Sequence, residues 1–300
     1  MFLSELYRYP VKSGQAQSLQ ASQVGLLGLQ GDRRWMVVEE ENGRFLTQRA
    51  WPQLGQIDAR DDDNGRLLLQ APGRVPLRVP VPAGDDGLRG VTIWRDTLRV
   101  PDAGDAAAAW LSALLGKAVR LVHCPEQRAR YLPNGYGYNS DRAAFPDGFP
   151  LLLIGQGSLD ELNRRIGRPM EMLRFRPNLV VQGAEPFAED GWKRIRIGSL
   201  EFRVLKPSVR CIFTTIDPAT GERSADREPM VTLKTFREKE GDVLFRQHIH
   251  SRTSTCIPGS SHPLPSTARF CPNSTSPSFS RKVLSVAIGS RSSLLSLIHI

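Results

Sequence analysis

The stretch RIRIGSLEFRVLKPSVRCIFTTI, residues 194–216, shows the pattern that decides the fold. Short runs of apolar and β-branched residues follow one another, with Gly198 or Pro207 between them. Runs of four to eight such residues bounded by glycine or proline are typical of β-strands. The stretch therefore predicts strands at residues 194–197, 200–205 and 211–216.

Similar runs occur along most of the chain, at residues 35–38, 67–69, 91–94, 98–100, 119–122, 150–154 and 178–181. Two segments instead predict helices. Residues 105–115 hold an alanine run that stops at Gly116, and residues 158–166 begin with Ser158 and Glu161 in capping-box spacing. Many short strands at close spacing favour a barrel or sandwich over a doubly wound sheet. We expect a mainly β protein with some helix, of the α+β class.

The composition changes sharply after residue 245. Residues 246–300 contain fourteen serines, six basic residues and no Asp or Glu. A typical soluble sequence is about a quarter charged, with both signs present. We expect an aberrant, disordered tail, either a natural one or the product of an out-of-frame C-terminus.

The formal net charge of +9 suggests a nucleic-acid partner only at first sight. Without the six basic residues of the tail, residues 1–245 carry a net charge of only +3. Net charge alone supports the nucleic-acid hypothesis, so we expect neither a nucleic-acid nor a membrane partner.

The four cysteines, Cys124, Cys211, Cys256 and Cys271, are too few and too scattered for a disulfide framework. No pair of them has metal-ligand spacing. The first residues, MFLSELYRYPVKS, lack the apolar segment of a secretory signal. These features together indicate a chain of the reducing cytoplasm.

Cys211 is the most informative single residue. It directly follows Arg210, and a neighbouring guanidinium favours the thiolate, the form that binds soft metals. One cysteine cannot build a structural zinc site, but it can bind a metal that an organic cofactor already holds. On spacing alone, a buried and inert cysteine remains the alternative.

Basic and polar residues recur next to predicted strands. Lys12 and Ser13 follow one strand, Arg33 and Arg34 precede another, and Arg174 and Arg176 lie just before Asn178. Arginine binds phosphate bidentately, and lysine binds it as a point charge. Each residue alone could be a solvated strand end, but as a set they suggest an anionic cofactor.

The order of these motifs resembles the MOSC family in its subgroup with an N-terminal β-barrel domain. Its members include the amidoxime-reducing component and bacterial proteins that detoxify N-hydroxylated bases. The resemblance runs from about residue 3 to residue 245. It rests on YPVKS (9–13), DRRW (32–35), TQR (47–49), FRPN (175–178), RCIFTTIDP (210–218) and PMVTLK (229–234).

The resemblance implies an N-terminal β-barrel-like domain at residues 1–122, packed on a MOSC β-barrel domain at residues 123–245. It implies that Cys211 ligates molybdenum and that Asp147 is a catalytic residue near the metal. It also assigns the binding of the molybdenum–molybdopterin cofactor to Lys12, Ser13, Arg33, Arg176, Asn178 and Arg210.

The activity that the resemblance implies is a molybdenum-dependent reduction of small N-hydroxylated substrates, in which the metal accepts the substrate's oxygen. The chain has no C-x4-C-x2-C run for an iron–sulfur cluster, so the electrons would come from a separate ferredoxin- or flavin-type protein. The alternative is a module without reductase activity that binds pyridoxal phosphate or carries sulfur.

The sequence departs from the family at its C-terminal end. Relatives continue after Leu244-Phe245 with Gly-Gln and the closing strands of the barrel, whereas this chain continues with Arg246-Gln247-His248 and the serine-rich tail. A barrel without its closing strands exposes unpaired edges, which leaves the activity of this chain an open question.

Overall fold

The computed structural model describes residues 1–83, 87–132, 136, 141–251, 282–285 and 298–299. Strands dominate it, as expected for a mainly β protein. The helices of the described residues are α1 (Asp105–Leu115), α2 (Gln156–Ile166) and α3 (Met230–Arg237), with the 3₁₀ helices η1 (Pro52–Gln56), η2 (Glu126–Arg128), η3 (Met172–Phe175), η4 (Ala188–Gly191) and η5 (Ile212–Thr215).

The strands of the first half are β1 (Phe2–Arg8), β2 (Gln17–Ser18), β3 (Ala21–Gly25), β4 (Gly28–Leu29), β5 (Trp35–Glu39), β6 (Asp58–Asp61), β7 (Leu67–Gln70), β8 (Leu77–Val79), β9 (Leu88–Ile93), β10 (Asp96–Pro101) and β11 (Val119–His123). Those of the second half are β12 (Arg130–Tyr131), β13 (Arg142–Ala143), β14 (Leu151–Gly155), β15 (Leu179–Gln182), β16 (Arg194–Ile197), β17 (Leu200–Arg210), β18 (Glu238–Lys239), β19 (Asp242–Ser251), β20 (Lys282–Ser285) and β21 (Ile298–His299).

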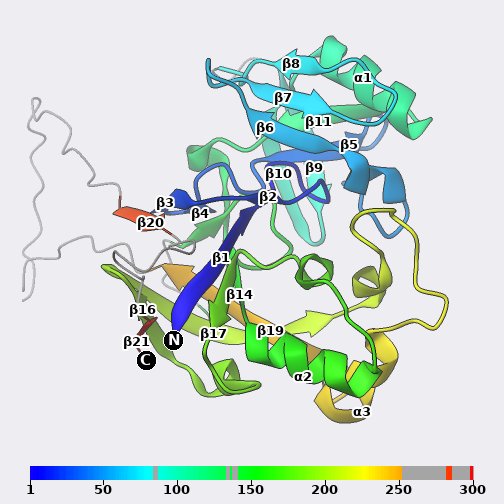
Figure 1. Ribbon diagram of the computed structural model, residues 1–300. Coiled ribbons are helices and arrows are strands. Elements are labelled where there is room, and N and C mark those ends of the chain that lie inside the picture. Colours follow the sequence, from blue (N-terminus) through cyan, green and yellow to red (C-terminus); the bar gives the residue numbers. More distant parts are fainter. Residues whose placement is uncertain (84–86, 133–135, 137–140, 252–281, 286–297, 300) are drawn as a thin grey trace, which may run out of the picture.

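One large sheet organises the second half, in the order β2-β1-β15-β14-β19-β17-β16-β21. The first strand of the chain lies inside this sheet, because β1 pairs antiparallel with β15. Apolar residues of both halves form its core, including Leu3, Leu6, Leu153 and Ile249. In Figure 1, β1 connects the part of the molecule that holds α1 to the part that holds α2 and α3.

Smaller sheets build the rest of the first half. β5 pairs with β11, β9 with β10, and β6, β7 and β8 form a three-stranded sheet next to α1 (Figure 1). A separate apolar core lies under this helix and includes Val37, Leu69 and Leu111. Of the predicted strand-end residues, Lys12 and Ser13 follow β1 of the large sheet, and Arg33 precedes β5 of a smaller sheet.

The two predicted helices differ in how well the sequence placed them. α1 begins and ends as predicted, with Gly116 in the left-handed conformation at its C-terminus. α2 begins at Gln156, two residues before the predicted start. Ser158 does not cap it, because its hydroxyl donates to the buried carboxylate of Glu189, 2.7 Å away. A long-range partner replaced the local capping box.

Residues 211–216 do not form the predicted strand. β17 ends at Arg210, and η5 follows. The hydroxyl of Thr214 donates to the carbonyl of Cys211 (3.1 Å), and that of Thr215 to the carbonyl of Ile212 (2.7 Å). Threonine side chains that bond to nearby carbonyls favour a local turn over a sheet ladder.

The predicted tail boundary at residue 245 is also wrong for its first six residues. β19 continues to Ser251 and pairs with β14 on one side and β17 on the other. Two later strands also pair with the described part of the chain, since β20 lies on β3 and β21 on β16. Cys256 and Cys271 lie outside the described residues.

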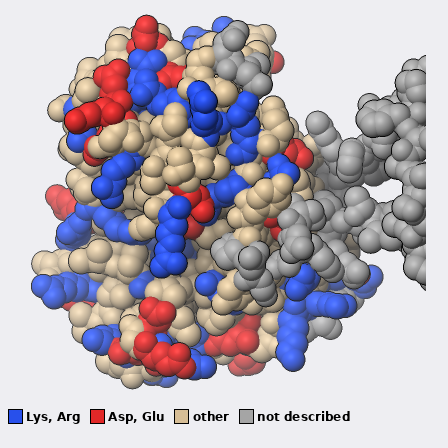
Figure 2. Space-filling view, turned by 180° about the vertical axis from the view of Figure 1, so that it is seen from behind, with Lys and Arg blue, Asp and Glu red and all other residues tan. Residues whose placement is uncertain are grey.

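Charged residues of both signs intermix on the face of the molecule drawn in Figure 2. No helix among the described residues is long and apolar enough to cross a membrane.

The course of β19 predicts that Ile249→Ala destabilises the protein by roughly 2–5 kcal/mol, the usual cost of emptying a core position. Ile249 is fully buried and lies opposite Leu151 on one neighbouring strand and Val204 on the other. Urea unfolding measures the change. The matched control is Val75→Ala, at a side chain 82% exposed, which should change stability by less than about 0.5 kcal/mol. Equal midpoints for both variants would mean that residue 249 lies in an unstructured tail.

Candidate functional site

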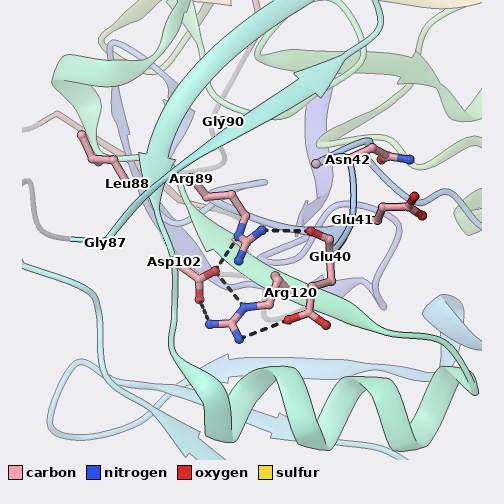
Figure 3. A pocket seen from close by; sticks show the side chains of 10 residues that line it. Glu40, Glu41, Asn42, Gly87, Leu88, Arg89, Gly90, Asp102 and Arg120 are labelled. Atoms are coloured by element: carbon pink, nitrogen blue, oxygen red, sulfur yellow. Dashed lines mark hydrogen bonds and ion pairs between the residues drawn. The ribbon is translucent and has the colours of Figure 1, made fainter.

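A cavity of about 580 Å³ in the first half is the larger of two candidate sites. It is lined by Glu40, Glu41, Asn42, Gly43, Gly87, Leu88, Arg89, Gly90, Asp102 and Arg120. Figure 3 shows that Arg89 and Arg120 both point at Asp102. None of the residues that the sequence predicted for the site lines this cavity.

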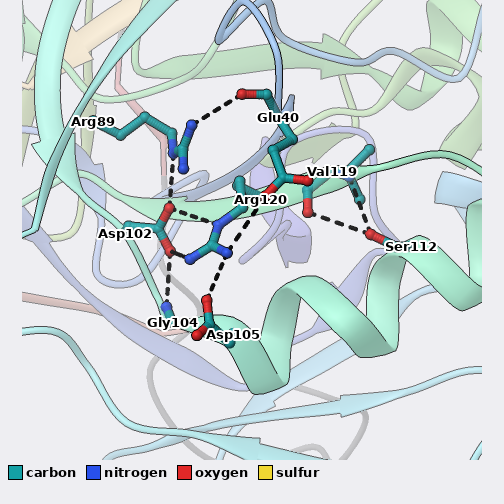
Figure 4. Close-up of polar contacts among 8 residues, drawn as sticks. All are labelled: Glu40, Arg89, Asp102, Gly104, Asp105, Ser112, Val119 and Arg120. Atoms are coloured by element: carbon teal, nitrogen blue, oxygen red, sulfur yellow. Dashed lines mark hydrogen bonds and ion pairs between the residues drawn. The ribbon is translucent and has the colours of Figure 1, made fainter.

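The charged groups of this cavity already neutralise one another. Asp102 accepts hydrogen bonds from Arg89 (2.8 Å) and Arg120 (2.7 Å), and Arg120 also reaches Asp105 (Figure 4). The backbone N–H of Gly104 donates to the same carboxylate. Arginines that are paired with an internal carboxylate do not need an external anion, so this cluster is structural.

The second candidate site surrounds Cys211, which is a free, half-buried thiol. Its backbone is extended and leads from the end of β17 directly into η5. Arg210 precedes it and is buried, and its charge interacts with Cys211, Asp147 and Arg49. Burial lowers the pKa of Arg210 to about 10, which reflects how little water and how few partners its charge has.

Lys12 and Asp147 form an ion pair at this site. The ammonium of Lys12 is buried, bonds to the Asp147 carboxylate and donates to the carbonyl of Phe145 (2.9 Å). Burial lowers the pKa of Lys12 to about 8, although the charge of Asp147 opposes this shift. Desolvation would raise the pKa of Asp147, but the charge and hydrogen bond of Lys12 hold it well below its usual range.

Arg33 and Arg176 stack on Tyr9, with their guanidinium carbons 4.4 and 4.1 Å from the centre of the ring. Arg33 also donates to the backbone carbonyl of Arg176 (3.3 Å). Burial lowers the pKa of Arg176 to about 10, and Arg33 adds to this shift. Nη2 of Arg176 is buried without a hydrogen-bond partner.

Electrostatic interactions thus link most of the predicted residues around Cys211. Arg210 interacts with Cys211 and Asp147, Asp147 pairs with Lys12, and Arg176 interacts with both Asp147 and Arg33. Residues from positions 12 to 211 therefore share one electrostatic environment.

Asn178 and Ser13 play more local parts. The amide of Asn178 accepts from Arg33 (3.1 Å) and the Leu152 N–H, and donates to the carbonyl of Tyr7. Asn178 therefore positions Arg33 and joins β1 to β14. Ser13 is buried in the turn after β1, with a positive φ of 66°.

Two arginines that were grouped with the site have other bonding partners, although Arg174 also lines a cavity together with Arg176. Arg34 donates to the carbonyl of Cys124 (2.7 Å), and Arg174 pairs with Asp217 (2.6 Å), which holds the turn after η5.

Sequence reasoning missed several residues that shape the site. Trp94, from the turn between β9 and β10, donates to Asp147 (3.1 Å), and Arg49 lies over its indole ring (5.0 Å). Arg130 donates to the carbonyls of Pro146 and Ala144, and so holds the loop that carries Asp147. Of these, only Arg49 lay in a quoted motif, TQR; the others had no local signal.

The chemistry of the site is that of an anion cradle beside one thiol. Nε of Arg210, Nη2 of Arg176 and Nε of Arg49 are buried without partners. A cavity of about 210 Å³ is lined by Arg176, Tyr9 and Phe213, among others, but not by Arg210, Arg49 or Cys211. No group of three or more His, Cys, Asp or Glu within the described part of the chain could hold a metal ion. A metal at Cys211 would therefore need most of its ligands from a cofactor.

Two family matches cover most of the chain. Residues 1–118 match the MOSC N-terminal beta barrel domain, and residues 140–255 match the MOSC domain. The second match extends past residue 245, in agreement with the end of β19 at Ser251.

Characterised relatives match over similar lengths. Mitochondrial amidoxime-reducing component 1 of Danio rerio is 33% identical, over 78% of this chain and 74% of the relative. Mitochondrial amidoxime reducing component 2 of Bos taurus is 34% identical, over 78% and 72%. A molybdenum cofactor sulfurase of Oryza sativa subsp. japonica is 30% identical, over 81% of this chain and 32% of the relative.

The shared carboxylate of the first cluster predicts that Asp102→Asn destabilises the protein by about 1–3 kcal/mol at neutral pH, because two arginines lose a charged acceptor. Burial alone would raise the pKa of Asp102, but hydrogen bonds from Arg120, Arg89 and Gly104 lower it. Its contribution is thus present above the unfolded carboxyl's pKa of about 3.9 and is lost as the pH falls through the lower folded value. Urea unfolding at pH 7 and pH 3 measures it. Asp105→Asn, at a side chain 96% exposed, is the control; an equal loss there would refute the assignment.

The ion pair of the second cluster predicts that Asp147→Asn lowers the pKa of Lys12 below its value of about 8, since the carboxylate opposes the effect of burial. NMR titration of ¹³C-methylated lysines measures this, and the signal missing from Lys12→Arg identifies the residue. Asp105→Asn should leave the midpoint unchanged. A midpoint that stays or rises in Asp147→Asn would show that the two groups do not interact in solution.

Proposed function

The chain belongs to the MOSC family, and from this premise we propose that it binds a molybdenum cofactor through Cys211 and reduces N-hydroxylated substrates with it. Its relatives include proteins named as amidoxime-reducing components and as a molybdenum cofactor sulfurase. The name of the first group supports the reaction, and both names are consistent with the cofactor.

One observation of this chain carries the proposal: guanidinium nitrogens of Arg176 and Arg210 are buried without a hydrogen-bond partner, and Arg210 directly precedes a free thiol. Buried polar groups are normally hydrogen-bonded, and unpaired buried charges are costly. A phosphorylated, anionic pterin would supply the missing acceptors. The thiolate of Cys211 would be a soft ligand for its molybdenum, as thiolates are for other soft metals. The residues present therefore fit the group.

The residues divide into those that would touch the cofactor and those that would position them. Nη2 of Arg176 and Nε of Arg210, which have no partner in the protein, would contact its anionic part, together with Ser13. Lys12 would face it from the Asp147 pair. Arg33 has partners in Asp32, Asn178 and the carbonyl of Arg176, so its part is to fix Arg176 in place.

A molybdenum cofactor supplies two-electron redox chemistry, and the protein supplies binding, orientation and electrostatics. Reduction of an N-hydroxyl group to an amine consumes two electrons and two protons and releases water. The ammonium of Lys12, whose pKa is about 8, would hold a proton at Nζ at neutral pH and deliver it to the departing oxygen. The ionised carboxylate of Asp147 keeps that ammonium in place.

The electrons would come from a separate ferredoxin- or flavin-type protein, because the sequence has no iron–sulfur motif. We also propose the cytoplasm as the compartment, since Cys124 and Cys211 are both free thiols.

The alternative, pyridoxal phosphate binding, has one observation in its favour. A buried lysine with a lowered pKa, here Lys12, next to arginines suits an aldehyde that carries a phosphate. In that case the protein would be yellow and would lose its colour with borohydride.

The proposal predicts about one molybdenum atom per chain in protein purified from a host that makes the cofactor, and less than a tenth of this in Cys211→Ser. Elemental analysis by mass spectrometry measures the metal. The matched control is Cys124→Ala, because the Cys124 thiol is fully buried and burial raises its pKa to about 11. Equal metal in the wild type and Cys211→Ser would refute the role of Cys211, and borohydride-sensitive colour would support pyridoxal phosphate instead.

A further inference from the structure

Arg246 occupies a backbone position that is unusual for its residue type. Pro207 pairs with Gln247 and Val209 with Leu244, so that two residues of β19 lie opposite the single residue Ser208. This is a β-bulge, a feature that often lies next to active sites and re-aims a side chain. Arg246 has a φ of +78° there, in the left-handed region that favours glycine. An arginine is held in this conformation only because its surroundings impose it.

The side chain of Arg246 points into the protein, where only 6% of the residue is exposed. Its charge interacts with those of Arg210, Arg33 and Arg176, which all repel it. Nε and Nη1 are buried and have no hydrogen-bond partner. Guanidinium groups do not lose their proton in proteins, so this is a buried cation among cations.

The nearby carboxylates do not neutralise Arg246. Asp32 pairs with Arg33, and Asp147 pairs with Lys12. Unpartnered donors of Arg176, Arg210 and Arg246 thus remain in one neighbourhood. Several N–H groups that lack an acceptor call for an anion with several oxygens.

We propose that Arg246 is a further ligand of the anionic group bound at this site, and contacts its phosphate oxygens directly. This rests on the proposed function only in that both use the same anion site.

The alternative is that Arg246 merely fills space, at a backbone position that favours glycine. The two cases predict opposite changes in anion affinity when Arg246 is replaced. If Arg246 is a ligand, its removal weakens anion binding. If it is an obstruction, its removal leaves binding unchanged or strengthens it.

Arg246→Gly in the full chain, freed of any bound cofactor, tests the proposal with inorganic pyrophosphate as the probe. Isothermal titration calorimetry should show binding at least about tenfold weaker than in the wild type, since a charge-assisted contact is lost. In anion-free buffer, the melting temperature should rise, because a buried unpaired cation and a strained backbone are removed.

Arg227→Gly is the matched control. Arg227 also has a positive φ, 60°, but is exposed, so the change relieves the same conformation and removes the same charge at the surface. It should leave pyrophosphate binding within about twofold of the wild type and raise the melting temperature less than Arg246→Gly does.

Unchanged or tighter pyrophosphate binding in Arg246→Gly would overturn the proposal. If that variant does not fold, Arg246→Gln and Arg246→Lys decide: weaker binding in the neutral variant alone supports a ligand role, and equal binding in both refutes it. The molybdenum content of wild type and Cys211→Ser is independent of these results. The inference can therefore fail while the proposed function stands, and the reverse is also possible.

Discussion

Buried positive charge without an internal counter-charge is the constraint on which the site depends. Asp32 and Asp147 neutralise Arg33 and Lys12, and the donors left on Arg176, Arg210 and Arg246 have no acceptor in the described part of the chain. Such an arrangement is costly in an unliganded protein. It becomes favourable when an anion binds, so the same residues that lower the stability of the empty protein supply the affinity for the ligand.

The large sheet is what brings these charges together. It joins β1, β15, β14, β19 and β17 in this order, so that chain segments separated by about two hundred residues belong to one sheet. The turn after β1 carries Lys12, and the end of β17 carries Arg210 and Cys211. Asn178 fastens the arrangement, because its side chain bonds to β1, β14 and Arg33 together. The site thus lies where the first strand leaves the large sheet for the smaller sheets of the N-terminal half.

The sequence predicted those elements whose signals are local. α1 was placed to the residue, since an alanine run and Gly116 define both its ends. The sequence-based prediction failed where a distant partner or a side chain competed with the local pattern. Glu189 took the hydroxyl of Ser158, and the hydroxyls of Thr214 and Thr215 turned the predicted strand after Arg210 into η5. The serine-rich composition after residue 245 hid the end of β19. Pairing with β14 on one side and β17 on the other, and not a local sequence pattern, extends this strand.

The two arginine clusters show why residue type alone could not identify every member of the site. Arg120 and Arg210 are both buried or nearly so, and both lie at or near the end of a strand. Arg120 has Asp102 and Asp105 within hydrogen-bond reach, whereas Arg210 finds only the hydroxyl of Ser208 at 3.4 Å. What separates a structural arginine from one available to a ligand is therefore the placement of carboxylates, which tertiary structure decides. Motifs identified Lys12, Arg33 and Arg176, because residues close to them in the sequence are also close to them in the site. Arg246 was not, because the bulge opposite Ser208, and not any pattern around it, turns its side chain inward.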